Sequence, residues 1–125
     1  MPKRVLVVDD AIFMRSMIKD IFTSGGYEIV GEAANGIEAV QRYHDLRPDL
    51  TTMDIVMPFK SGIEATREIV SGDPRAVVLM CSALGQESLV MEAIEAGAVD
   101  FVVKPFRADD VLAIVARVLT ARAAG

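Results

Sequence analysis

Acidic, hydroxyl and basic side chains occur at the points where apolar stretches of the sequence end. Asp9 and Asp10 follow one such stretch, Asp54 ends another, and Ser82 and Lys104 follow two more. Three crowded carboxylates would repel one another and raise each other's pKa values unless a cation lay among them. An all-oxygen site with few carboxylates and room for water suits Mg²⁺ better than Ca²⁺. The three aspartates are therefore candidate magnesium ligands.

The same residue types suit phosphoryl transfer, a reaction in which Mg²⁺ and the protein position the reactants and neutralise charge. Asp54 could act as a nucleophile and form an acyl phosphate. Ser82 could donate a hydrogen bond to a phosphoryl oxygen, and Lys104 would supply a compact positive charge. The sequence has no glycine-rich nucleotide loop and no nearby His or Glu for general acid catalysis, which disfavours a kinase or a nucleotide hydrolase.

Apolar periodicity predicts five strands that alternate with five helices. We expect strands at 3–8, 27–33, 49–54, 76–81 and 99–103, and helices at 11–22, 36–46, 63–70, 86–95 and from 108 onward. This alternation predicts an α/β fold with a doubly wound parallel sheet and helices on both faces. Ligands of such sheets bind beyond the carboxyl ends of the strands. The candidate residues lie at those ends, so we expect them to meet.

Composition narrows the class of protein. A chain of 125 residues with 52% hydrophobic and 25% charged residues fits one globular domain over residues 1–125. A net charge of −5 provides no basic patch for nucleic acid. The apolar runs are too short to cross a bilayer and no signal peptide opens the chain, so we expect a cytoplasmic protein without a membrane partner. The single cysteine, Cys81, excludes an internal disulfide, and we expect a buried thiol.

Four motifs together resemble the receiver domains of two-component signalling, and the resemblance covers nearly the whole chain. They are VDD at 8–10, MDIVMP at 53–58 followed by Gly62, CSA at 81–83 and VKPF at 103–106. Residues 10–15 and 82–86 are more similar to the single-domain chemotaxis regulators than to receivers attached to transcription factors. The resemblance implies a monomer with a flavodoxin-like five-stranded sheet in the strand order 2-1-3-4-5.

The resemblance also implies a role for each residue of the acidic site. Asp54 would be the phosphoacceptor. Asp9 and Asp10 would hold Mg²⁺ together with Asp54, directly or through water, and the backbone carbonyl of Val56 would complete the protein ligands. Lys104 would contact the phosphoryl group.

The switching residues follow from the same resemblance. A cis bond to Pro105 would aim the preceding lysine at the phosphoryl group. Ser82, with Ala83 as a supporting residue, would move inward on phosphorylation, and Phe101 would rotate into the space vacated. A downstream partner would read the helix from Gln86, the strand that ends at residue 103 and the last helix.

The chain departs from the family pattern at two places. Phe101 stands where many relatives carry Tyr, so a hydroxyl that would report the switched state is absent. Val56 and Leu84 stand where relatives often carry polar side chains that help to orient an attacking water. Our hypothesis is that these apolar groups slow hydrolysis of the phosphorylated form, which would suit a regulator that relies on a separate phosphatase.

Three functions remain open at this point. The first is a phosphorylation-activated chemotaxis switch that receives its phosphoryl group from a histidine kinase and binds a flagellar motor protein. The second is a phosphorelay intermediate or a regulator of another motility or developmental system. The third is a receiver cut from a larger regulator, although a chain end that resembles a fraying helix, with no second domain after it, favours the first two. We expect a signalling domain and not an enzyme, because it would catalyse only its own modification and the hydrolysis of that modification.

Overall fold

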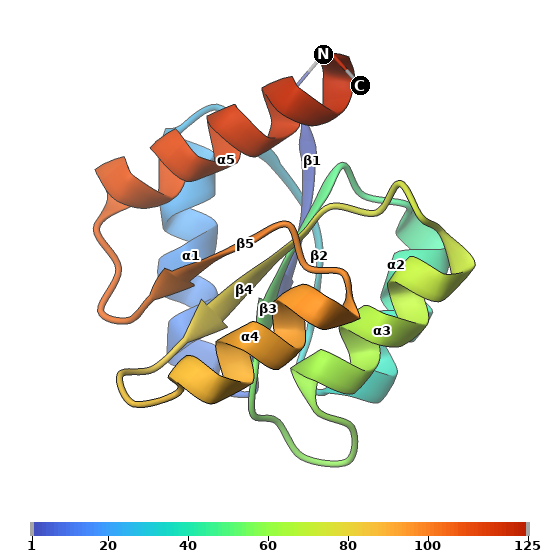
Figure 1. Ribbon diagram of the computed structural model, residues 1–125. Coiled ribbons are helices and arrows are strands. Elements are labelled where there is room, and N and C mark those ends of the chain that lie inside the picture. Colours follow the sequence, from blue (N-terminus) through green and yellow to red (C-terminus); the bar gives the residue numbers. More distant parts are fainter. Residues whose placement is uncertain (1, 125) are drawn as a thin grey trace.

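The computed structural model describes residues 2–124, in which strands and helices alternate along the chain (Figure 1). All four strand pairings are parallel and the strand order is β2-β1-β3-β4-β5, which confirms the expected fold class. The strands are β1 (Arg4–Val8), β2 (Glu28–Ala33), β3 (Leu50–Asp54), β4 (Val78–Ser82) and β5 (Asp100–Val103). The helices are α1 (Ile12–Ser24), α2 (Gly36–Leu46), α3 (Gly62–Gly72), α4 (Glu87–Ala96) and α5 (Ala108–Ala124).

Helices cover both faces of the sheet, α1 and α5 on one side and α2, α3 and α4 on the other (Figure 1). The alternation of side chains along β1 shows why. Val5 and Val7 belong to the core cluster beneath α1 and α5, whereas Leu6 and Val8 belong to the cluster beneath the other three helices. Successive residues of a strand point to opposite faces, so a strand covered on both sides must be apolar throughout.

β4 begins two residues later and ends one residue later than the expected strand at 76–81. Ala76 is buried, but its backbone N–H donates to the carbonyl oxygen of Asp73 in a turn, so the residue does not join the sheet. At the other end Ser82 pairs with Val103 and belongs to the strand. The hydroxyl of Ser82 is therefore held by a strand and not by a loop.

The start of α3 lies against the end of β3. A capping box between Ser61 and Glu64 fixes the first turn of the helix. The N–H of Gly62 donates to the carbonyl oxygen of Ile55 at 2.8 Å, and a Cβ atom at position 62 would collide with the carbonyl oxygen of Asp54. Only glycine fits this close approach, so the helix supports the backbone of the candidate phosphoacceptor directly.

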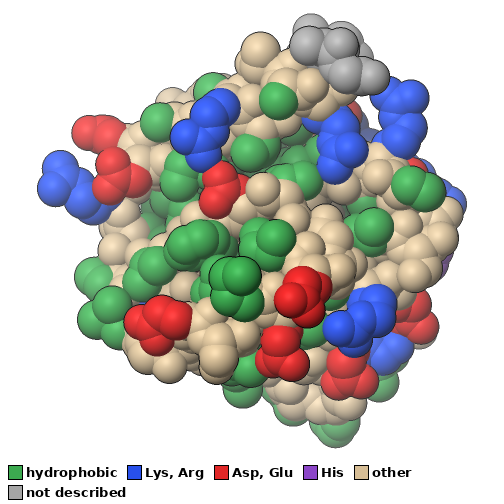
Figure 2. Space-filling model, in the orientation of Figure 1, with side chains coloured by type: hydrophobic (Ala, Val, Ile, Leu, Met, Phe, Trp, Pro, Cys, Tyr) green, Lys and Arg blue, Asp and Glu red, His purple; other side chains and the backbone are tan. Residues whose placement is uncertain are grey.

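The face formed by α4, β5 and α5 exposes apolar side chains alongside acidic ones (Figure 2).

Cys81 is buried as expected, and burial raises the pKa of its thiol to about 12. None of the helices within residues 2–124 is long and apolar enough to span a membrane.

Candidate functional site

The three candidate aspartates meet at the carboxyl edge of the sheet. Asp9 and Asp10 come directly after β1, and Asp54 is the last residue of the neighbouring strand β3. One carboxylate oxygen from each lies within 4.8 Å of the others. Asp9 is 1% exposed and Asp54 is 7% exposed, whereas Asp10 is exposed. The cluster is a candidate metal centre that opens to solvent on the side of Asp10.

Lys104 connects the two buried carboxylates. Its Nζ atom lies 3.3 Å from Oδ2 of Asp9 and 3.4 Å from Oδ1 of Asp54. The lysine follows β5, and its backbone N–H donates to the carbonyl oxygen of Ser82 at 2.8 Å. The peptide bond from Lys104 to Pro105 is cis. One positive charge therefore faces two negative charges, while a third lies close by on Asp10.

The charge balance of the site favours protonation of Asp54. Burial, followed by the negative charge of Asp9, raises the pKa of Asp54 to about 6, and the positive charge of Lys104 opposes this only in part. Burial also disfavours the charged form of Lys104, but the charges of Asp54 and Asp9 outweigh it and raise the pKa of the lysine. An additional cation would compensate the remaining negative charge.

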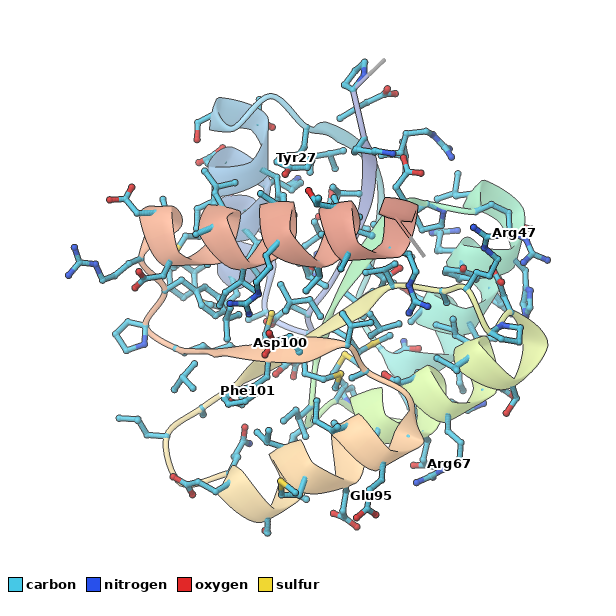
Figure 3. All side chains as sticks on the ribbon, turned by 45° about the horizontal axis from the view of Figure 1, so that its top comes forward. Tyr27, Arg47, Arg67, Glu95, Asp100 and Phe101 are labelled. Carbon is cyan, nitrogen blue, oxygen red and sulfur yellow. The ribbon has the colours of Figure 1, made fainter. Side chains whose placement is uncertain are left out.

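Within residues 2–124, the side chains of the other predicted residues form no hydrogen bond to the three aspartates or to the amino group of Lys104. Ser82 ends β4 next to β3, and its buried hydroxyl donates to the carbonyl oxygen of Val102 at 3.5 Å. Phe101 lies on β5 on the side of α4 and is 38% exposed (Figure 3). The switching roles of both residues stay predictions. The side chains of Val56, Ala83, Leu84 and Pro105 are exposed.

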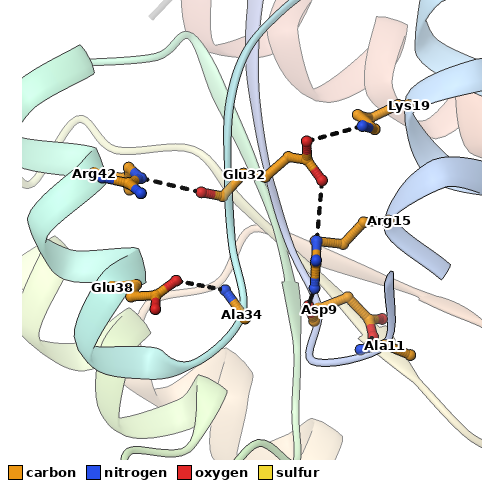
Figure 4. A network of polar contacts seen from close by, with 8 residues as sticks. All are labelled: Asp9, Ala11, Arg15, Lys19, Glu32, Ala34, Glu38 and Arg42. Carbon is orange, nitrogen blue, oxygen red and sulfur yellow. Dashed lines mark hydrogen bonds and ion pairs between the residues drawn. The ribbon is translucent and has the colours of Figure 1, made fainter. Parts of the chain in front are cut away.

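Sequence reasoning missed a basic residue that fixes Asp9 (Figure 4). Nη1 of Arg15 donates to the backbone carbonyl of Asp9 at 2.7 Å, and Nε of Arg15 donates to Glu32 at 3.0 Å. Lys19, one turn further along α1, donates to the same Glu32 at 2.8 Å. The backbone N–H of Ala11 donates to Oδ1 of Asp9 at 2.9 Å. The backbone and the carboxylate of Asp9 are thus both held in place, from α1 and β2.

A match to a family model and several relatives place this site in context. Residues 5–116 match the model of the response regulator receiver domain. The chain is 60% identical to the chemotaxis protein CheY of Thermotoga maritima over 107 residues, which cover 86% of this chain and 89% of the relative. It is 55% identical to the chemotaxis protein CheY of Bacillus subtilis over 119 residues, which cover 95% of this chain and 99% of the relative.

A solved structure supports the same placement. The crystal structure of the CheX-CheY-BeF3-Mg²⁺ complex from Borrelia burgdorferi matches with a TM-score of 0.90 and 42% identity, over 94% of this chain and 90% of that chain. Fold and site together define a doubly wound α/β domain with an acidic pocket for phosphoryl chemistry. The chain belongs to the response regulator receiver family and is homologous to CheY. Phosphorylation on an aspartate follows from membership of this family.

The raised pKa of Asp54 predicts a pH-dependent effect of the substitution Asp54→Asn. Without divalent metal, the native state keeps a proton on Asp54 up to about pH 6, whereas the unfolded chain releases it near the ordinary value of 3.8. The stability of the parent therefore falls as the pH rises through this window, and the loss is complete above it. The variant carries no such charge, so above pH 6 it should be the more stable protein. We expect a difference on the order of 1 kcal/mol, because solvent screens part of the charge.

Urea unfolding in a metal chelator at about pH 4 and about pH 7.5 measures this difference. Asp45→Asn, at an exposed position of α2, is the control and should show no such change. Equal stabilities of Asp54→Asn and the parent at both pH values would contradict the proposed charge crowding.

Proposed function

We propose that this chain is a phosphorylation-activated switch of a chemotaxis-type two-component system, with Asp54 as the site that accepts a phosphoryl group from a histidine kinase. The placement of Lys104 within 3.4 Å of both Asp9 and Asp54 carries this assignment. A carboxylate nucleophile, an acidic metal pocket and a lysine that neutralises phosphoryl oxygens then share one edge of the sheet. The similarity to proteins named as chemotaxis regulators supports the signalling system.

The pocket fits Mg²⁺. Asp9, Asp10 and Asp54 would hold the ion together with the backbone carbonyl of Val56, and the ion would neutralise charge on the phosphoryl oxygens. Burial, and after it the negative charge of Asp9, raises the pKa of Asp54 despite Lys104, so a bound divalent cation would stabilise the ionised carboxylate. Arg15 would keep Asp9 in position, because it fixes the backbone of that residue.

The chain's own residues would carry the transfer itself. An ionised carboxylate oxygen of Asp54 attacks the phosphorus atom, the bond from phosphorus to the donor nitrogen breaks, and an acyl phosphate forms. Lys104 faces Oδ1 of Asp54 and is placed to hold the transferred group. The domain would act only on itself, so we class it as a signalling protein and not as an enzyme.

Phosphorylation would then act on Ser82 and Phe101. The hydroxyl of Ser82 now donates to the carbonyl oxygen of Val102, and it would turn toward the new phosphoryl oxygens. Phe101 is partly exposed beside a groove that Ser82 also lines, so it has space to rotate inward. A downstream partner such as the flagellar motor switch would read the resulting change on α4, β5 and α5.

Beryllofluoride, a stable mimic of the phosphoryl group, tests this proposal. In ¹⁹F NMR we expect bound fluoride signals from the parent only when Mg²⁺ is present, and none from Asp54→Asn. Asp45→Asn, on the exposed surface of α2, serves as the control and should behave like the parent. Bound signals that persist in Asp54→Asn, or their absence from the parent, would refute the assignment.

The apolar side chains beside Asp54 predict a long-lived phosphorylated form. Val56 is 57% exposed and Leu84 is 80% exposed, and neither can orient an attacking water. We expect Val56→Asn or Leu84→Glu to speed loss of the phosphoryl group on the order of tenfold, equivalent to about 1.4 kcal/mol in the activation free energy. Phosphate release after removal of the donor measures the rate.

Ile94→Gln is the matched control for the lifetime experiment. It replaces a partly exposed apolar residue near the opposite end of α4 and should leave the rate unchanged. Variants at 56 and 84 that decay no faster than the parent would show that the apolar side chains do not set the lifetime.

A further inference from the structure

A groove of about 260 Å³ lies between the start of α4 and β5. Its walls are mostly apolar, and the large side chains of Leu84 and Met91 are 80% and 62% exposed. Figure 2 shows this face with apolar side chains gathered over α4 and β5 and acidic side chains beside them. The lining residues are Ser82, Ala83, Leu84, Glu87, Val90, Met91, Phe101 and Val103.

The chain segment that builds this groove carries charge of one sign. Residues 83–103 contain Glu87, Glu92, Glu95 and Asp100, and no Lys, Arg or His. Figure 3 shows Glu95 on α4 and Asp100 and Phe101 on β5. The part of the surface around the groove that residues 83–103 form is therefore acidic.

The acidic residues of α4 have no cationic partner among the described residues. The nearby cations contact other groups instead. In α5, Arg117 contacts Asp100 at 2.7 Å and Arg122 donates to the carbonyl oxygen of Ala76 at 3.4 Å. Arg107, just before α5, lies 3.9 Å from Asp110. Glu87, Glu92 and Glu95 are exposed and form no ion pair within residues 2–124. These three carboxylates remain available to a partner.

Unpaired carboxylates of α4 lie on the same face of the helix as an apolar side chain that lines the groove. Glu87, Met91 and Glu95 are four residues apart on one helix, so their side chains lie along one face of α4. Glu87 also lines the groove. An apolar strip flanked at both ends by unpaired negative charge is complementary to a segment with apolar side chains between cations.

We infer that the partner read by this face is a cationic amphipathic segment, with large apolar side chains in the groove and Lys or Arg against Glu87 and Glu95. This inference rests on the proposed function, which makes the face a readout surface. An acidic segment would meet unpaired carboxylates of the same sign, and like-charge contacts act against wrong partners and slow their encounter. Ser82 and Phe101 line the same groove, so its occupancy would be coupled to phosphorylation.

Two synthetic peptides with the same apolar residues test the charge preference, one with Lys and the other with Glu at its polar positions. Fluorescence anisotropy measures their affinity for the full chain loaded with beryllofluoride and Mg²⁺. We expect the Lys peptide to bind about tenfold more tightly than the Glu peptide, and its affinity to fall as salt is added. Glu87→Gln/Glu95→Gln should weaken the Lys peptide about fivefold.

A double variant at the other edge of the sheet separates local from net charge. Glu28→Gln/Asp45→Asn removes two carboxylates from β2 and α2, and β2 is the edge strand opposite β5. This control should bind the Lys peptide as the parent does. No binding of the Lys peptide, equal binding of both peptides, or an equal loss in both double variants would overturn the inference.

The ¹⁹F signal of the beryllofluoride-loaded sample distinguishes a wrong inference about the partner from a wrong proposed function. If no adduct forms, the phosphoryl site is wrong, and the peptides are then measured on the unloaded chain. A preference for the Lys peptide that depends on Glu87 and Glu95 would still support the charge selectivity of the face. If the adduct forms and the preference is absent, the inference about the partner is wrong and the phosphoryl site stands.

Discussion

Two buried carboxylates opposite a single lysine are the constraint on which the rest of the structure depends. Asp9 and Asp54 are almost completely buried, and Lys104 lies between them. Such crowding is unfavourable unless the backbone holds each group in place, and several contacts do so. Arg15 and the N–H of Ala11 fix Asp9, and the close approach of α3 supports the backbone of Asp54. Unbalanced charge is thus held ready for a cation and a phosphoryl group.

The sheet also connects this charge to the surface. The backbone N–H of Lys104 donates to the carbonyl oxygen of Ser82, so the ends of β4 and β5 are joined directly. Ser82 in turn contacts the carbonyl oxygen of Val102, next to Phe101. A change of charge on Asp54 would therefore reach the groove beside α4 through adjacent residues of two paired strands. A direct path of this kind suits a two-state switch.

Much of this architecture can be predicted from sequence because it depends on local pattern. Apolar periodicity determines the alternation of strands and helices, and the carboxyl ends of parallel strands necessarily share one edge. Asp9, Asp10, Asp54 and Lys104 were found in this way. The contact from Arg15 to the backbone of Asp9 could not be predicted, because it depends on how α1 packs. The groove and the unpaired charges of α4 likewise depend on which cations α5 brings near, which sequence spacing does not show.

The most direct test of the account is the intact mass of the chain after incubation with a small acyl phosphate donor, with and without Mg²⁺, for the parent and Asp54→Asn. We predict an added mass of one phosphoryl group on the parent in the presence of Mg²⁺, and none on the variant or without the metal. A phosphoryl adduct that forms equally well on Asp54→Asn would contradict the account, because the crowded carboxylate would then not be the acceptor.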